Sequence, residues 1–345
     1  MTPVSISDRE FRLAVEAAIL APSMHNSQPW RFRLDGDEVH VLADLGRTPP
    51  VADPDGWALR IACGAATYNL QLAFAVNGTP LSVHWRPDPA QPTLLAALRP
   101  GPAGPPTPDQ ERLFRAIPRR RSNRRPFHPE PVPSAARVAM IQAAASAGAW
   151  LDLVVGPIPL AAVSEIAHAA NRVLLRNAAY AAELAAWSRR DGHEAEGVPA
   201  GAGGLTVGPQ DLLPQRPVGE LVRTPTDVTD EPLVGVLGTA GNSSRDQLQA
   251  GYALQHVLLT ITDHGLACSL LSQPIEVPAA KEQLRIALGR RGTPQMVLRI
   301  GYGDPAPPTP RRPVTEVIET GAVQAGALET GIRWADPAGY RSLPA

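Results

Sequence analysis

Apolar and polar positions follow two clear periods in the first part of the chain. In residues 8–20 the apolar side chains recur at near-helical spacing, and Pro22 ends the pattern. This spacing predicts an amphipathic helix. Directly after it, the apolar stretches 30–34 and 39–42 flank the glycine-containing sequence 35–38, a pattern typical of a β-hairpin. A helix followed by strands predicts an α+β domain.

A weak internal repeat predicts that this plan occurs twice. Residues 64–78 and 251–265 are mostly apolar segments of equal length, and each runs from glycine to glycine. Each is typical of a buried helix that ends at a glycine in the left-handed conformation and is followed by a strand. Residues 15–21 and 141–147 resemble each other in the same way. The alternative is a chance similarity between alanine-rich helices, because a single sequence fixes little.

Proline and glycine divide the chain into two parts. Residues 99–108 consist largely of these two residue types, which cannot continue a helix or a β-ladder, so we predict a linker there. We therefore expect an N-terminal half at residues 1–100 and a C-terminal half at 109–320. Residues 321–345 would form a C-terminal extension.

Two further segments of the C-terminal half stand out. Residues 160–190 predict one long helix that carries Trp187 near its end. The helix leads into residues 191–232, an irregular stretch that is too long for an ordinary connection. We expect this stretch to be either mobile or a cover over a site, that is, a possible lid. Residues 296–302 form a strongly apolar segment and predict a strand.

Composition is consistent with a globular protein of two domains. The chain has 345 residues, of which 44% are hydrophobic and 19% charged. Its formal net charge of −1 gives no reason to expect a nucleic acid, an anionic membrane or an acidic partner, so an anion site would have to be local. The sequence shows no apolar signal core and no apolar run long enough to span a membrane. We expect a cytoplasmic protein.

Cysteine and histidine give no sign of a metal site. Cys63 and Cys268 are the only cysteines, and each lies among small apolar residues, which favours buried thiols over a disulfide. The histidines are scattered without metal-ligand spacing. Lys281 is the only lysine among 32 basic residues. This bias most simply reflects genome composition, but it also means that any phosphate clamp must use guanidinium groups.

Two arginine-containing segments are candidates for anion binding. Residues 119–125 place five arginines around Ser122 and Asn123, and such forked donors beside a hydroxyl suit a terminal phosphate. The alternative is a solvated basic loop or a nucleic-acid patch, because charge runs usually lie on the surface. The second segment follows the predicted strand 296–302 and contains Arg311 and Arg312. It is either a second half of the clamp or a plain surface loop.

Three motifs in order resemble a known family. They read Ala-Pro-Ser-Met-His-Asn-Ser-Gln-Pro-Trp at residues 21–30, Arg-Arg-Ser-Asn-Arg at 120–124, and Gly-Tyr followed by Arg-Arg-Pro-Val between 301 and 314. Together they resemble the FMN-dependent nitroreductase superfamily, and more narrowly the two-domain Acg-type nitroreductase-like proteins. The resemblance extends from about residue 8 to about 318, and the motifs are specific only in combination.

The resemblance implies a particular architecture. Ordinary nitroreductases are dimers in which each FMN lies between an arginine-serine motif of one chain and a Pro-Ser-x-x-Asn motif of the other. Here residues 22–26 supply only the second motif and residues 120–124 only the first. The fold class implied is therefore α+β, with two tandem nitroreductase-like domains, each a mostly antiparallel sheet flanked by helices. One chain would imitate a dimer and hold one FMN, while further oligomerisation stays open.

The resemblance also implies the site residues and the reaction. The backbone of Leu271 and Ser272 would point at the flavin, and no side chain would act as acid or base. Gln28 and Trp30 have a structural alternative, because Gln-Pro-Trp also begins the predicted hairpin; we favour a core position for Trp30. The residues implied to bind FMN are Ser23, Met24, His25, Asn26, Gln28, Arg119, Arg120, Arg121, Ser122, Asn123, Arg124, Leu271, Ser272, Gln273, Pro274, Arg311 and Arg312.

Two functions follow from this reading. In the first, NADPH or NADH reduces FMN, and a small nitro compound, quinone or biosynthetic intermediate is then reduced. In the second, the chain stores FMN under a lid formed by residues 191–232, with little turnover. Because fold does not fix function, the position of that segment would discriminate between them. A nucleic-acid binder is a third class, which the near-neutral charge disfavours.

Overall fold

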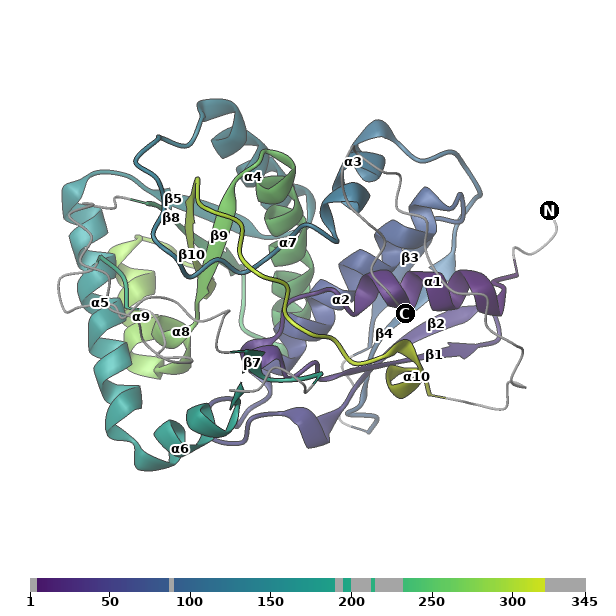
Figure 1. Cartoon of the computed structure of the whole chain (residues 1–345), viewed down its shortest axis with the longest axis horizontal. Helices are drawn as coiled ribbons and strands as arrows, with labels where there is room; N and C mark the ends of the chain where they lie inside the picture. The colour runs from purple at the N-terminus through teal and green to yellow at the C-terminus, as the bar shows by residue number, and fades with distance from the viewer. Residues whose placement is uncertain (1–4, 87–89, 190–194, 200–211, 215–231, 320–345) are drawn as a thin grey trace.

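The computed structural model describes residues 5–86, 90–189, 195–199, 212–214 and 232–319. It contains two four-stranded sheets, and a long helix covers a face of each: α2 (Trp57–Val76) on the first and α7 (Ser244–Asp263) on the second. These two helices pack against each other in the middle of the molecule (Figure 1). No helix in the described ranges is both long and apolar enough to cross a membrane.

The N-terminal half builds one antiparallel sheet. It begins with α1 (Asp8–Ala18), where Ser7 and Glu10 form a capping box. A hairpin of β1 (Trp30–Asp35) and β2 (Glu38–Ala43) follows, in which Trp30 pairs with Ala43. The helix α2 comes next and leads into the second pair of strands. These strands are β3 (Leu81–Trp85) and β4 (Leu94–Pro100), which give the sheet order β1-β2-β4-β3. The predicted first helix and hairpin are therefore confirmed.

The C-terminal half repeats this topology. After α3 (Pro108–Ala116), the repeated elements are α4 (Ser134–Ser146), β5 (Trp150–Val154), β8 (Leu233–Thr239), α7, β9 (Ala267–Leu271) and β10 (Thr293–Gly301). Their sheet order is β5-β8-β10-β9, which corresponds strand by strand to the first sheet. The predicted α+β fold of two similar antiparallel halves is confirmed, and the strand predicted at 296–302 corresponds to β10, which begins earlier, at Thr293, and ends at Gly301.

The C-terminal half also carries insertions. Where the first half has a tight turn between β1 and β2, the second half places α5 (Pro157–Arg176), α6 (Ala178–Ala186), β6 (Ser188–Arg189) and β7 (Val198–Pro199). Between β9 and β10 lie α8 (Gln273–Glu276) and α9 (Pro278–Ala287). The prediction of a single helix at 160–190 is wrong, because the helix breaks at Asn177. The backbone of Asn177 is extended, and its side-chain oxygen accepts hydrogen bonds from the N–H groups of Ala179 and Tyr180, which caps a new helix.

Glycines set the distance between the two central helices. A Cβ atom on Gly64 would lie 2.1 Å from the carbonyl oxygen of Leu248, and one on Gly251 would lie 2.0 Å from that of Ile61. The helices therefore cross backbone to backbone at the first glycine of each repeat. The second glycines, Gly78 and Gly265, have φ values of +83° and +71° and end the helices as predicted.

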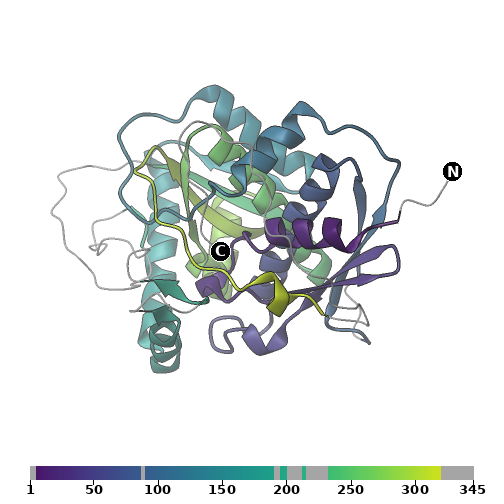
Figure 2. The same ribbon diagram turned by 45° about the vertical axis from the view of Figure 1, so that its right-hand side comes forward.

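The end of the described chain returns from the second half to the first. Residues 302–313 run past the loop between α1 and β1 and lead into α10 (Val314–Val317) beside β1 (Figure 2). There the N–H of Glu319 donates to the carbonyl oxygen of Phe32 at 2.8 Å. Trp30 is fully buried in the core under the first sheet, and Cys63 and Cys268 are buried free thiols, as expected.

Several expectations fall on parts of the chain outside the described residues. Of the possible lid at 191–232, the structure describes only residues 195–199, 212–214 and 232, and the extension 321–345 lies wholly outside them. The boundaries 1–100 and 109–320 stay predictions.

Candidate functional site

A cavity lies where the two halves meet. It encloses about 1170 Å³ of space, part of which is open to solvent. The loop between α1 and β1, the start of α2, residues 120–124, the β9–α8 junction and the returning C-terminal segment all contribute to its wall. Its described lining consists of Pro22, Ser23, Met24, His25, Asn26, Trp57, Ala58, Ile61, Ala62, Arg120, Arg121, Ser122, Arg124, Val198, Pro214, Leu254, Ser269, Leu270, Leu271, Ser272, Gln273, Met296, Pro307, Thr309 and Arg311.

The loop from Ser23 to Gln28 has an unusual backbone. His25, Asn26 and Gln28 have φ values of 53°, 56° and 51°, in the left-handed region that side chains other than glycine rarely adopt. The loop is held by the hydroxyl of Ser23, which accepts a hydrogen bond from the N–H of Gln28 at 3.0 Å. Such conformations each cost of order 1–3 kcal/mol and cluster at functional sites. This strain is an independent sign that the loop has a function.

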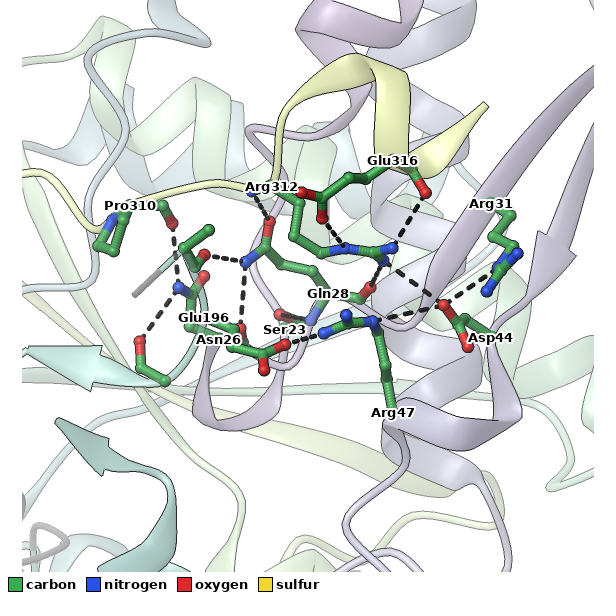
Figure 3. A network of polar contacts seen from close by, with 12 residues as sticks. Ser23, Asn26, Gln28, Arg31, Asp44, Arg47, Glu196, Pro310, Arg312 and Glu316 are labelled. Atoms are coloured by element: carbon green, nitrogen blue, oxygen red, sulfur yellow. Dashed lines mark hydrogen bonds and ion pairs between the residues drawn. The ribbon is translucent and has the colours of Figure 1, made fainter. Parts of the chain in front are cut away.

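Asn26 and Gln28 tie three chain segments together (Figure 3). The two N–H groups of the Asn26 amide donate to the carbonyl oxygens of Gly197 at 3.1 Å and Pro310 at 3.0 Å. The Gln28 amide donates to the carbonyl oxygen of Ala195 at 2.6 Å and accepts from the N–H of Arg312 at 2.8 Å. Both donors of Asn26 are thus committed to the protein, and Gln28 lies behind the cavity wall.

Arg120 is a deeply buried cation of the cavity wall. It is 4% exposed, and its Nη2 donates to the carbonyl oxygen of Leu20 at 3.3 Å. Its Nε and Nη1 are buried and have no hydrogen-bond partner among the described residues. Burial, together with the charge of Arg121, lowers the pKa of Arg120 to about 10. A buried cation with open donors is costly unless an anion pairs with it.

The other residues of the arginine run have different positions. Arg119 is exposed on the surface, where its Nη2 lies 4.0 Å from a carboxylate oxygen of Asp263. Asn123 is buried, donates to the carbonyl oxygen of Asp304 at 2.8 Å and joins the loop to β9 through a bond from its own N–H to Cys268. Neither lines the cavity, whereas Arg121, Ser122 and Arg124 do.

Arg311 and Arg312 point to opposite sides of the returning segment. Arg311 lines the cavity, donates to the side-chain oxygen of Asn26 at 2.9 Å and to the carbonyl oxygen of Ile19 at 2.8 Å. Burial and the charges of Arg120 and Arg121 lower its pKa to about 9. Arg312 turns towards the first half, where its Nη1 lies 3.5 Å from Asp44. Of these two arginines, only Arg311 can therefore reach a ligand in the cavity.

The junction after β9 supplies the floor of the cavity. Leu271, Ser272 and Gln273 line it, and Gln273 donates to the carbonyl oxygen of Pro214 at 3.4 Å. Pro274 lies in the first turn of α8, outside the lining. The described parts of the predicted lid also reach the cavity, through Val198 and Pro214.

The cavity brings together most of the residues predicted from the sequence. Those that line it are Ser23, Met24, His25, Asn26, Arg120, Arg121, Ser122, Arg124, Leu271, Ser272, Gln273 and Arg311, while Gln28, Arg119, Asn123, Pro274 and Arg312 do not. Their proposed contacts with FMN stay predictions. Sequence reasoning missed the apolar wall, chiefly Trp57, Ala58, Ile61, Leu254 and Met296. No local signal distinguishes these from ordinary core residues.

The other half carries different side chains at the positions that correspond to the cavity wall. Counting from Gly64 and Gly251, Trp85 takes the place of Ser272, and Gln249 takes that of Ala62. The indole N–H of Trp85 donates to Gln249 at 2.8 Å, and Gln249 donates to the carbonyl oxygen of Ala147 at 2.5 Å. Two large side chains joined by a hydrogen bond thus lie at the positions that correspond to Ser272 and Ala62 of the cavity wall.

Comparison with known proteins finds a family profile and solved structures that are similar to parts of this chain. The profile of a family described as "Putative TM nitroreductase" matches residues 4–63. Of the solved structures, the FMN and NADPH-dependent nitroreductase NfnB from sphigopyxis sp. strain HMH is 18% identical and covers 61% of this chain and 99% of its own, with a TM-score of 0.39.

Curated relatives match over nearly the whole length. "Putative NAD(P)H nitroreductase Rv3131" of Mycobacterium tuberculosis is 35% identical over 325 residues, which is 89% of this chain and 90% of the relative. "Putative NAD(P)H nitroreductase acg" of the same species is 29% identical and covers 93% of this chain and 99% of its own. The chain belongs to this family of NAD(P)H nitroreductase-like oxidoreductases.

Proposed function

We propose that the cavity binds FMN and that the chain uses NADPH or NADH to reduce a small organic acceptor, such as a nitro compound or a quinone. The names of the relatives support the oxidoreductase class. The lining supports the cofactor, because it combines a cationic end with an apolar wall. The observation that carries the proposal is the buried guanidinium of Arg120, which has two nitrogen atoms without a hydrogen-bond partner among the described residues and belongs to the wall of a cavity lined with further arginines.

The cationic end suits the phosphate of FMN. Arg120 offers its unpartnered Nε and Nη1, and Arg311 and Ser122 lie in the same wall. A phosphate monoester carries a charge of roughly −1.5 to −2 and three acceptor oxygens, which can take up the donors that the protein itself leaves open. Asn26 would act indirectly, because its oxygen accepts from Arg311 and thereby fixes that guanidinium.

The apolar wall suits a flat ring system. Trp57, Ile61 and Leu254 come from the paired helices, and Met296 comes from β10. When bound, FMN supplies the hydride chemistry, at N5 of its ring. The residues of the chain hold the ring, present the backbone of Leu271 and Ser272 at the junction after β9, and exclude water through Met24, Val198 and Pro214. No side chain needs to act as a general acid or base in this proposal.

A pair of adjacent arginines provides the test. We expect Arg120→Met to weaken FMN binding about a hundredfold or more, because two charge-assisted hydrogen bonds are lost. Without FMN, the same variant should be as stable as the wild type or more stable, since it removes a buried charge without a partner. Arg119→Met is the matched control, because Arg119 is exposed and outside the cavity. The measurements are fluorescence titration with FMN and urea unfolding of the apoprotein.

Anaerobic reduction separates the enzyme from the store. A yellow protein that bleaches within seconds of adding NADPH or NADH and regains its colour with a nitroarene supports the oxidoreductase. A yellow protein that stays oxidised would favour the FMN store. Failure to take up FMN, or equal FMN affinity in Arg120→Met and the wild type, would refute the proposed site.

A further inference from the structure

One tryptophan forms part of the apolar wall of the cavity. Trp57 begins α2 and is 8% exposed, and no other phenylalanine, tyrosine or tryptophan occurs among the lining residues that the structure describes. It belongs to the same apolar cluster as Ile61 and Met296, which also line the cavity. Because an indole is a large flat group, the direction of this one ring decides the shape of the space beside it.

The indole of Trp57 is held from behind the wall by Gln295. Its Nε1–H donates to the side-chain oxygen of Gln295 at 2.9 Å. Gln295 is fully buried and does not line the cavity. It lies in β10, where the pairing with β8 shifts by one residue between Pro294 and Met296, so Gln295 is the extra residue of a β-bulge. Bulges re-aim side chains, and this one places the amide against the indole.

The orientation of the Gln295 amide is fixed by its other partners. Its Nε2 donates to the side-chain oxygens of Thr239 and Asn242, both at 3.1 Å. The same oxygen of Asn242 accepts a hydrogen bond from Nζ of Lys281 at 3.0 Å. Because an ammonium group and an indole N–H can only donate, the amide nitrogen of Gln295 must face Asn242 and its oxygen must face Trp57. The indole therefore has a single orientation in this network.

The acceptor on Gln295 keeps the polar edge of the ring out of the cavity. A buried N–H group without a hydrogen bond is costly, and buried tryptophans usually find a partner for theirs. Since Trp57 borders a cavity that is partly open to solvent, an indole deprived of Gln295 would recover a hydrogen bond by turning its N–H into that space. The ring would then enter the volume that a ligand needs.

We infer that the ring of FMN packs against Trp57 and that Gln295 is a positioning residue, which acts on the flavin only through the indole. This inference rests on the proposed function. The bond between the two side chains leaves the apolar part of the indole for the flavin, and contacts between flat aromatic rings are favourable beyond the area that they bury.

Two variants test the two ends of this hydrogen bond. Gln295→Met removes the acceptor from an unbranched side chain, and Trp57→Phe removes the donor but keeps a ring. Each should weaken FMN binding about fivefold in a titration of the apoprotein, the factor that one hydrogen bond typically contributes. An indole in contact with a flavin quenches its fluorescence, because it gives an electron to the excited ring and takes it back. The fluorescence of bound FMN should therefore be weak in the wild type and rise in both variants.

The double variant shows whether Gln295 acts through Trp57. We expect Gln295→Met to add nothing to the loss of affinity that Trp57→Phe already causes. Gln249→Met is the matched control, because Gln249 accepts the same kind of hydrogen bond from Trp85 at 2.8 Å outside the cavity; both measurements should equal those of the wild type. If Gln295→Met does not fold, Asn242→Ala replaces it with the same expected pattern, since this exposed residue holds the amide of Gln295 from the surface.

Two results overturn the inference alone. The first is a single variant, Trp57→Phe or Gln295→Met, that binds FMN with the affinity and fluorescence of the wild type. The second is a loss of affinity from Gln295→Met that is equally large in the Trp57→Phe background. A protein that takes up no FMN refutes the proposed function, and the inference with it.

Discussion

The crossing of the central helices gives the sharpest test of the fold. Gly251→Ala places a Cβ atom 2.0 Å from the carbonyl oxygen of Ile61, whereas real Cβ atoms essentially never come closer than 3.0 Å. The contact is with backbone, so no side-chain rotation can relieve it. The two helices must therefore separate by about 1 Å at their closest point.

Two opposing terms decide the size of the effect. Alanine is favoured over glycine inside a helix by about 1 kcal/mol, so helix propensity alone predicts a gain in stability. Overpacking typically costs about 1–3 kcal/mol, and a gap of about 1 Å forfeits up to half of the dispersion energy of the neighbouring contacts. Because both helices are 20 residues long and almost wholly buried at the crossing, we expect a net loss of about 2 kcal/mol or more in the free energy of unfolding.

Urea unfolding followed by circular dichroism measures the change. Gly64→Ala should behave alike, since its Cβ would lie 2.1 Å from the carbonyl oxygen of Leu248. Gly104→Ala is the control, because no atom lies within 4 Å of the Cβ that it would add. If Gly251→Ala unfolded at the same urea concentration as the wild type or a higher one, the close backbone contact of the helices would be wrong.

Two further predictions concern stability. Burial lowers the pKa of His256 from 6.5 to about 4, so the unfolded chain takes up a proton before the native one does, and stability falls as the pH drops from about 6.5 to about 4. His256→Gln should remove a dependence on the order of 2 kcal/mol from unfolding curves measured across that range, and parallel curves would contradict it. Asn177→Ala removes the cap of α6 and should lower the free energy of unfolding by about 1 kcal/mol. Asn171→Ala, in the interior of α5, is its control and should not lower it.

Helices and strands could be predicted from the sequence more accurately than the directions in which individual side chains point. The glycine-to-glycine repeat gave two buried helices and their ends, because a left-handed glycine is a local signal. The sequence did not show why glycine is needed at positions 64 and 251, because the close backbone contact there joins two segments far apart in the chain. Likewise, Arg311 and Arg312 form one motif in the sequence. Adjacent side chains of an extended segment point to opposite sides, so only one of them enters the cavity.

The apolar wall and the roles of the loop could not be predicted at all. Ile61 and Leu254 have the sequence pattern of core residues, and only the packing of α2 on α7 makes them line a cavity. Asn26 matched a motif for contact with a cofactor, yet its two donors bind Gly197 and Pro310. These partners are 171 and 284 positions away in the chain, beyond any pattern that a single sequence displays.

The hydrogen bond between Trp85 and Gln249 has a consequence for how such a chain can evolve. In a dimer of identical subunits, every substitution appears twice, so a residue that closes one site closes both and abolishes the activity. Here the two halves are encoded separately, and Trp85 fills one position while Ser272 leaves its counterpart open. The position of Trp85 can therefore accumulate residues that only stabilise the molecule, while selection for chemistry acts on its counterpart at Ser272 and on the rest of the one cavity, to which both halves contribute.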